Sequence, residues 1–203
     1  MKKNIDLIKL KNKIEKYEYI SFDIFDTLIK RNIDNPTKVA MMLEKKNNIV
    51  GFSKERIDSE INCWKNKKDK EFNLSTIYKN IKNFSEKQKK ELMKEEIELE
   101  KNICTVNLNM ISFYDYCKKI KKKIVLISDM YLPKNVIEEI LNKNGITYYE
   151  KIYISSEVGK TKSNGKLFDF VIKDLGIKPK EIIHIGDNLR GDYLMPKIKK
   201  WVQ

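Results

Sequence analysis

The chain has 203 residues, of which 41% are hydrophobic and 10% aromatic, enough for one folded domain with a smaller accessory part. Lysine and arginine outnumber aspartate and glutamate by 42 to 29, which gives a net charge of +13. No apolar run approaches the ~20 residues of a membrane-spanning helix, and no apolar stretch follows the basic N-terminus, so neither a membrane span nor a secretory signal peptide is expected.

The first part of the chain is predicted to be mostly helical. Helical spacing of apolar residues predicts a helix over 4–16, and a run of β-forming residues predicts a strand over 19–23. Caps and amphipathic spacing predict further helices over 37–46, 53–67, 75–82, 85–102 and 110–122. Nothing between Arg31 and Lys122 has the pattern of a strand, so residues 32–122 are expected to form an all-helical insertion.

From Lys123 onward, strands and helices alternate. Short apolar runs predict strands over 123–128, 149–155 and 181–186. Helices are predicted to follow them, over 133–144, 164–175 and 191–199. This alternation is typical of an open α/β sheet. We expect a Rossmann-like, mainly parallel sheet built from residues 1–31 and 123–203, interrupted by the helical insertion.

The basic residues and the cysteines exclude two classes of function. Arginine occurs only at Arg31, Arg56 and Arg190, whereas nucleic-acid readers favour arginine, so no nucleic-acid partner is expected. The lysine excess accompanies an excess of isoleucine and asparagine, which share A/T-rich codons, and lysine clusters are expected to be solvated helix faces. The 3 cysteines form no CxxC pair and His184 is the single histidine, which argues against a zinc site. Unpaired thiols, expected to be buried in helices, fit a cytoplasmic protein.

Polar residues follow each predicted strand of the sheet. Ligands of open α/β sheets bind at the carboxyl ends of the strands, so these residues are candidates for a common site. Strand by strand, they are Asp23, Asp26 and Thr27; Ser128 and Asp129; Glu157, Gly159, Lys160 and Lys162; and Asp187, Asn188 and Asp192. Carboxylates from two strands can bind Mg²⁺, a hydroxyl and a lysine can bind phosphate oxygens, and one carboxylate remains to attack a substrate.

Four motifs follow these strands: FDIFDTL, Ser128 within ISDMYLP, Lys162 within SSEVGKTK, and HIGDN with Asp192. In this order they resemble the motifs of the haloacid dehalogenase (HAD) superfamily of aspartyl phosphotransferases and phosphatases. The resemblance covers the whole α/β part and implies a HAD-like fold in which residues 32–122 form a helical cap. More narrowly, the motifs resemble HAD domains found with bacterial surface-polysaccharide glycosyltransferases, which implies such an enzyme as a partner.

The resemblance also implies a role for each motif residue. Asp23 would be the nucleophile that forms an aspartyl-phosphate and would also bind Mg²⁺, while Thr27 would brace the loop. Ser128 would bind the phosphoryl group, and Lys162 would neutralise negative charge beside Asp23, with Lys160 open as its rival. The other Mg²⁺ ligands would be the backbone carbonyl of Phe25, Asp187 and, in support of the metal or its waters, Asp192.

The sequence departs from the family's phosphatases at Phe25. Those enzymes have an aspartate there as general acid and base, and a phenylalanine side chain cannot transfer a proton. Asp26 is chemically able to do so, although it fills the usual glycine position. The family's dehalogenases also lack an acid at this position, but they need no Mg²⁺ and depart from the acidic fourth motif, which Asp187 and Asp192 preserve here.

The resemblance implies Mg²⁺-dependent hydrolysis of a small phosphate monoester, of the sugar or nucleotide phosphate class. The alternative is a weakly active or inactive HAD-like module that binds rather than cleaves and works with a glycosyltransferase. A receiver domain, which also combines Asp, Ser or Thr, and Lys, has its motifs in another order. His184 is expected to be a packed strand residue without reach to the site.

Overall fold

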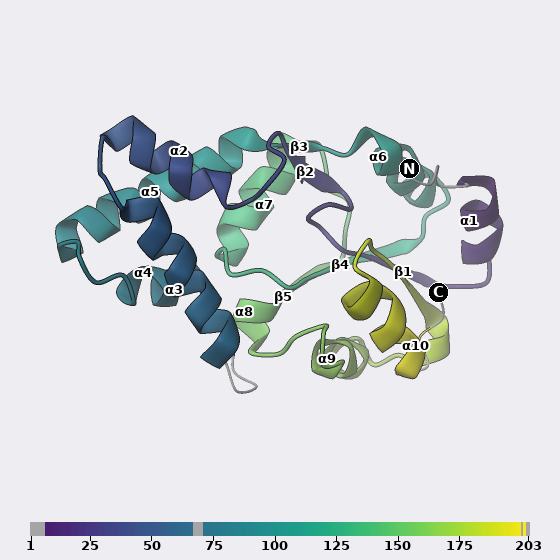
Figure 1. The fold of residues 1–203 in the computed structure, drawn as a ribbon. Helices are drawn as coiled ribbons and strands as arrows, with labels where there is room; N and C mark the ends of the chain where they lie inside the picture. The colour runs from purple at the N-terminus through teal and green to yellow at the C-terminus, as the bar shows by residue number, and fades with distance from the viewer. Residues whose placement is uncertain (1–6, 67–70, 200, 202–203) are drawn as a thin grey trace.

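The computed structural model, which describes residues 7–66, 71–199 and 201, has a parallel sheet with helices on both faces (Figure 1). The strands are β1 (Tyr19–Phe22), β4 (Lys123–Ser128), β5 (Lys151–Ile154) and β6 (Ile182–Ile185). They lie in the order β5-β4-β1-β6, and every neighbouring pair is parallel. Such a sheet buries both of its faces, which explains the continuous apolar run of β4. The predicted fold class, a Rossmann-like parallel sheet, is confirmed.

Alternate side chains of the strands enter two separate apolar cores. Ile20 and Phe22 belong to the core on one face, which is covered by α1 (Leu7–Ile14), α6 (Leu108–Lys119) and α7 (Lys134–Lys143). Tyr19 belongs to the core on the other face, with Phe168 of α9 (Lys166–Leu175) and Trp201. Both faces of the sheet are therefore shielded from water, and the polar residues are left at the strand ends.

Two short helical segments differ from the sequence prediction. A four-residue helix, α8 (Ser155–Val158), follows β5 directly where the strand was expected to end. The helix predicted over 191–199 begins earlier, as a π-helical turn, η2 (Leu189–Leu194), and continues as α10 (Met195–Ile198). The wide turn of η2 matters for the site because it carries Asp192.

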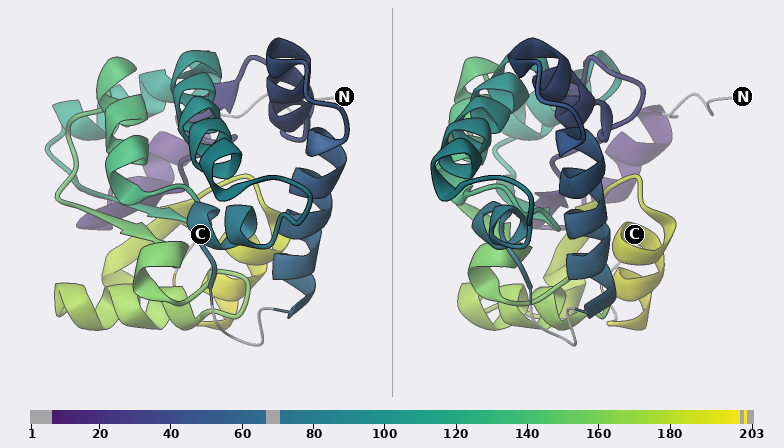
Figure 2. Two further views of the ribbon diagram at one scale, coloured as in Figure 1. Left: turned by 90° about the vertical axis from the view of Figure 1, so that its left-hand side faces the viewer. Right: turned by 60° about the vertical axis from the view of Figure 1, so that its left-hand side comes forward.

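Four helices between β1 and β4 form a group beside the sheet (Figures 1 and 2). They are α2 (Lys38–Asn47), α3 (Phe52–Asn66), α4 (Leu74–Lys79) and α5 (Glu86–Ile103). The longest helix, α5, begins at a capping box in which Ser85 and Gln88 satisfy each other's backbone N–H groups. Residues 4–6 of the first predicted helix and Lys67 of the third lie outside the described residues. The division into a core and a cap at residues 32 and 122 stays a prediction.

The prediction that only helices lie between Arg31 and Lys122 is wrong at β3 (Cys104–Val106). This strand pairs antiparallel with β2 (Ile29–Arg31), far away in the chain. Three residues are too few to show the alternation that identifies a strand in a sequence, and the pairing partner is not local. Cys104 therefore lies in a strand, whereas Cys63 and Cys117 are helical as expected. After β3 the chain returns to the sheet, because α6 packs against β4.

A buried ion-pair network joins the helical group to the loop after β4. Arg56 of α3 donates two hydrogen bonds to Glu96 of α5, at 2.6 and 2.9 Å, and Tyr78 of α4 donates to the same carboxylate at 2.7 Å. The Arg56 guanidinium also lies 5.3 Å from the ring centroid of Tyr131, which follows β4. The backbone N–H of Leu74 donates to the Tyr131 carbonyl at 2.9 Å. The helices are thus anchored to a loop that borders the strand ends.

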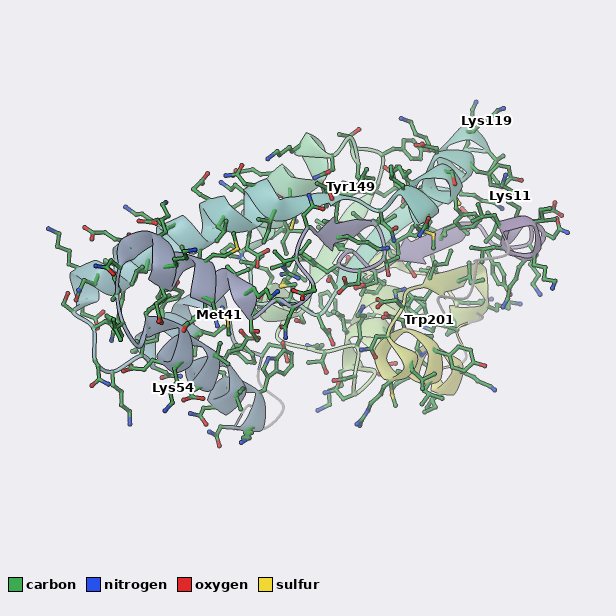
Figure 3. All side chains as sticks on the ribbon, turned by 45° about the horizontal axis from the view of Figure 1, so that its top comes forward. Lys11, Met41, Lys54, Lys119, Tyr149 and Trp201 are labelled. Atoms are coloured by element: carbon green, nitrogen blue, oxygen red, sulfur yellow. The ribbon has the colours of Figure 1, made fainter. Side chains whose placement is uncertain are left out.

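The lysine excess lies on the surface rather than at one site. Figure 3 shows Lys54 and Lys119 at opposite ends of the molecule, with both side chains exposed. In the described part of the chain, no helix combines the length and the apolar character that a membrane crossing requires.

Candidate active site

Asp23 lies at the carboxyl end of the central strand β1. Its backbone N–H donates to the carbonyl of Ile185 at 2.9 Å, which prolongs the pairing with β6 and fixes the start of the loop. The chain then turns tightly, with the N–H of Leu28 donating to the carbonyl of Ile24 at 2.9 Å. Asp26 has a φ of 62°, the left-handed conformation that favours glycine. The turn leaves the Asp23 side chain buried and Asp26 exposed.

One cavity of about 250 Å³ is lined by every residue predicted to take part in catalysis or to bind Mg²⁺, but not by the further candidates Thr27, Glu157, Gly159 and Lys160. Because β4 and β6 lie on either side of β1, the residues after these three strands meet at one edge of the sheet. The lining consists of Asp23, Phe25, Asp26, Arg31, Ser128, Asp129, Met130, Lys162, Ser163, Asp187, Asn188, Gly191 and Asp192. The fold thus brings the predicted residues together, while their chemical roles stay predictions.

Lys162 is the lysine that the structure places beside Asp23. Its Nζ atom lies 2.6 Å from Asp23 Oδ1 and 2.6 Å from Asp192 Oδ1, and the side chain is buried. Its backbone N–H donates to Asp129 Oδ1 at 2.8 Å, which ties its loop to the end of β4. Lys160 instead lies over the Phe170 ring, 5.3 Å from the centroid, in a separate hollow on α9. Geometry therefore favours Lys162 over Lys160 as the cation of the site.

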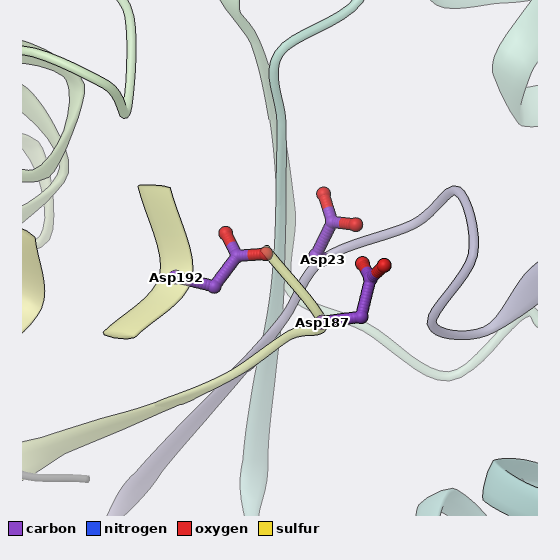
Figure 4. A group of neighbouring side chains, drawn as sticks. All are labelled: Asp23, Asp187 and Asp192. Atoms are coloured by element: carbon purple, nitrogen blue, oxygen red, sulfur yellow. The ribbon is translucent and has the colours of Figure 1, made fainter. Parts of the chain in front are cut away.

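Three carboxylates converge at the cavity. One oxygen each from Asp23, Asp187 and Asp192 lie within 4.8 Å of one another, as Figure 4 shows for the side chains. Mg²⁺ binds oxygen at about 2.1 Å and so spans oxygens about 4.2 Å apart, which small side-chain movements would reach. No hydrogen bond from another described residue ends on the Phe25 carbonyl, which leaves it free to act as a ligand. The donor set fits Mg²⁺.

The charges of the site also fit a divalent cation. Burial raises the pKa of Asp23 to about 7, with further upward contributions from Asp192 and Asp187 that the ammonium of Lys162 only partly opposes. Burial also raises the pKa of Asp187, as does the nearby carboxylate of Asp26. Three carboxylates face one ammonium group, so ionisation of all three leaves two negative charges without a partner. A divalent cation would balance them.

His184 is the packed strand residue that the sequence predicted, but the expectation that it has no reach to the site is wrong. Its Nε2 atom lies 3.1 Å from Asp192 Oδ1, and its Nδ1 atom lies 2.8 Å from Ser21 Oγ. The strand β6 lies where the sequence predicted it, but η2 folds back toward the strand and brings Asp192 next to His184. Gly186 permits this approach, because a Cβ atom there would collide with the Asp192 carboxylate. The ring and the hydroxyl therefore hold Asp192 in one orientation.

Two further residues at the site were missed in the sequence. Asn107 donates from Nδ2 to the Thr27 carbonyl at 2.7 Å and from its backbone N–H to the Leu28 carbonyl at 2.8 Å, so it braces the loop that carries Asp23. Nothing in the sequence signals this contact, and in the structure Asn107 also caps α6. Arg31 lines the cavity, and its signal was present: it is one of three arginines in the chain and lies three residues after the first motif.

Comparison with known proteins bears on the family and the fold. Residues 17–197 match the family model of haloacid dehalogenase-like hydrolases. A HAD-type hydrolase of Bacillus subtilis, solved with bound magnesium, superposes with a TM-score of 0.64 at 12% identity, covering 91% of this chain and 86% of that one. The L-2-haloacid dehalogenase of Xanthobacter autotrophicus with chloropropionic acid covalently bound superposes at 0.60 and 12% identity, covering 91% and 75%. At such identities the likeness shows the fold alone.

One curated enzyme shares a short segment with this chain. The glyceraldehyde 3-phosphate phosphatase of Methanopyrus kandleri is 38% identical over 45 residues, which are 22% of this chain and 19% of that enzyme. The family model, by contrast, spans most of the chain and includes the segments that carry Asp23, Ser128, Lys162 and Asp187. The chain belongs to the haloacid dehalogenase-like hydrolase family.

Proposed function

We propose that the protein hydrolyses phosphate monoesters in a Mg²⁺-dependent reaction, through an aspartyl-phosphate on Asp23. The observation that carries this proposal is the 2.6 Å ion pair between Asp23 Oδ1 and Lys162, in a cavity that Ser128 also lines. Lys162 binds one carboxylate oxygen and leaves Oδ2 to attack. A bond forms between Oδ2 and phosphorus, the bond from phosphorus to the ester oxygen breaks, and the alcohol leaves with one proton.

Hydrolysis of the aspartyl-phosphate completes the cycle. Water adds to phosphorus, the bond to Asp23 breaks, and inorganic phosphate leaves. The Ser128 hydroxyl would donate to a phosphoryl oxygen, and Lys162 would offset negative charge in both steps. Held by Asp23, Asp187, Asp192 and the Phe25 carbonyl, Mg²⁺ would reduce the repulsion between the phosphate and the carboxylates.

Two observations favour a small phosphate ester as the substrate. The carboxylates of Asp187 and Asp192 lie close enough to Asp23 to hold a cation together with it, which would suit an anionic phosphate and has no use in halide displacement. The local likeness to a sugar-phosphate phosphatase and the cavity of about 250 Å³ favour a sugar phosphate over a nucleotide. The test is a panel of phosphorylated metabolites assayed for inorganic phosphate with Mg²⁺ and with EDTA. Absence of Mg²⁺-dependent turnover for every member would contradict the proposal.

Proton transfer is assigned to Asp26, since Phe25 has no proton to give. Asp26 lines the cavity and is exposed to solvent, so it can exchange protons with water. We expect Asp26→Asn and Asp26→Gly to lower kcat about 100-fold, the lower end of the usual effect of losing a general acid and base. Both residues tolerate the left-handed backbone at this position, so a loss cannot be assigned to strain. Undiminished kcat in both variants would exclude this role.

Mg²⁺ is expected to stabilise the folded protein, and more so at pH 8 than at pH 5.5. The pKa of Asp23 is about 7 in the metal-free fold and near 3.8 when unfolded, so its contribution to folding is full below pH 4 and is lost as the pH rises through 7. Mg²⁺ binds the ionised carboxylate and must displace the proton at lower pH. At ten times its Kd the ion should add about 1.4 kcal/mol, visible as a higher Tm. A rise in Tm with Mg²⁺ that is equal at both pH values would contradict the assigned ligands. So would a rise in Asp187→Asn as large as that of the parent.

The second candidate function is a binding module without turnover, and the observation that favours it is Phe25 in place of the usual acid. Beryllofluoride binding with Mg²⁺, measured by calorimetry beside the turnover assay, separates the two. Binding that depends on Asp23 without turnover of any ester would identify a regulatory module. A glycosyltransferase partner stays a prediction, and none of the three proteins compared above bears on it.

A further inference from the structure

Arg31 is placed at the cavity by the two-stranded ribbon of β2 and β3, whose first strand follows the Asp23 loop. It ends β2, where it is paired in register with Cys104 of β3. Its side chain is only 8% exposed and lines the same cavity as Asp23 and Lys162. A cation so close to a phosphate site needs an explanation, because burying a guanidinium in a protein costs free energy unless a partner is present.

The partner of Arg31 is Glu100 of α5, which holds one edge of the guanidinium. Arg31 Nε donates to both oxygens of this carboxylate, at 2.8 and 3.1 Å, and the Glu100 side chain is 1% exposed. A guanidinium has five N–H donors, of which Nε carries one. Among the described residues no acceptor is hydrogen-bonded to the remaining four, on the two Nη atoms. Glu100 therefore fixes the orientation of the guanidinium group and leaves its two Nη atoms available for bidentate binding.

The ring of Phe25 supports the flat face of Arg31. The guanidinium carbon lies 4.6 Å from the ring centroid, which is the geometry of a cation–π contact. A phenylalanine ring also has no carboxylate that could accept hydrogen bonds from the Nη atoms. Phe25 therefore supports Arg31 without competing for its Nη donors.

Lys162, the other cation on the cavity lining, is already engaged by Asp23 and Asp192. We propose that Arg31 binds a second anionic group of the substrate, a carboxylate or a further phosphate, through its two Nη atoms. The substrate class is then a small phosphate monoester with a second oxyanion, and this assignment rests on the proposed phosphatase function. Bidentate binding of planar or tetrahedral oxyanions is what the guanidinium fork favours.

Three esters of equal chain length test the proposal. Propyl phosphate has a neutral far end, 3-phosphonooxypropanoate ends in a carboxylate, and propane-1,3-diyl bisphosphate ends in a second phosphate. We expect the parent protein, with Mg²⁺, to prefer at least one charged ester in kcat/KM by about 10- to 100-fold, the usual effect of a hydrogen bond to a charged group. The charged ester that is preferred more strongly shows whether Arg31 binds a carboxylate or a second phosphate.

The main variant is the double replacement Arg31→Gln and Glu100→Gln, which removes the cation without leaving a buried carboxylate unpaired. We expect its preference for the charged ester to fall to near one. Lys30→Gln, on the neighbouring residue of β2 and outside the cavity lining, loses the same charge and should keep the preference. Circular dichroism and Tm test whether each variant is folded.

The outcomes separate this inference from the phosphatase function. Equal turnover of the three esters by the parent, or a preference that survives in the double variant, overturns the role of Arg31 and leaves the phosphatase function standing. If no ester is turned over, ligand-induced Tm shifts provide the readout. A shift by the charged ester that is lost in the double variant supports Arg31 as the anion-binding residue although the phosphatase function fails.

Discussion

Replacing Asp23 by asparagine is expected to lower phosphatase turnover by about 10⁴- to 10⁶-fold, as loss of the nucleophile does in other covalent enzymes. Asparagine has the shape of the protonated aspartate but cannot form an acyl-phosphate. Because burial favours the neutral form of Asp23, the variant should be at least as stable as the parent without metal. The measurement is release of inorganic phosphate with Mg²⁺, beside a Tm for each protein.

Asp115→Asn is the matched control for this experiment. Asp115 is an exposed residue of α6, outside the cavity lining, and its replacement removes the same charge by the same chemical change. Turnover of the control should equal that of the parent. Equal turnover of Asp23→Asn and the parent would exclude Asp23 as the nucleophile. If Asp23→Asn lost both turnover and Tm, the loss of turnover would be assigned to unfolding.

Replacing Lys162 by methionine is expected to lower the free energy of unfolding by about 3–5 kcal/mol, the usual cost of leaving a buried charge without its partner. The Lys162 ammonium lies 2.6 Å from both Asp23 and Asp192, and all three side chains are buried. Without the ammonium group, nothing opposes the repulsion between the carboxylates of Asp23 and Asp192. Mg²⁺ should restore part of the stability, because it supplies positive charge to the same carboxylates. Chemical denaturation with and without Mg²⁺ measures both effects.

Turnover of Lys162→Met should fall about 1,000-fold under conditions where the variant is folded, since preorganised charge stabilisation at the phosphate is lost. Lys160→Met is the control, because Lys160 lies two residues away in the same loop, outside the cavity of Asp23, with its ammonium group over the Phe170 ring. Its loss should cost about 0.5–1 kcal/mol. If Lys160→Met lost more turnover than Lys162→Met, Lys160 would be the lysine that acts in the site.

The sheet was predictable because each strand has a local signature. Buried parallel strands need apolar side chains on both faces, and β4 and β6 show this as short apolar runs between helix signals. The pair β2 and β3 was not predictable in the same way, since three residues define no period and the partner strand is far along the chain. Only the folded chain makes Cys104 a neighbour of Arg31.

The candidate site was predictable to the extent that it follows strand order. Asp23, Ser128 and Asp187 follow adjacent strands, so their convergence is a property of the topology. The contacts of His184 and Asn107 depend on how η2 and the start of α6 fold back, which no local pattern encodes. Loops that reverse direction bring residues together through tertiary packing, and sequence spacing then gives no distance.

The ribbon of β2 and β3 makes the helical group a side branch of the fold. Because Arg31 and Cys104 are paired, the chain leaves and re-enters the α/β part at neighbouring points, and everything between them is a closed loop. Closing a loop twice as long costs only about 0.6 kcal/mol more in chain entropy. The side branch can therefore lengthen or shorten at little cost in chain entropy, while the strand order that brings Asp23, Ser128 and Asp187 together stays the same.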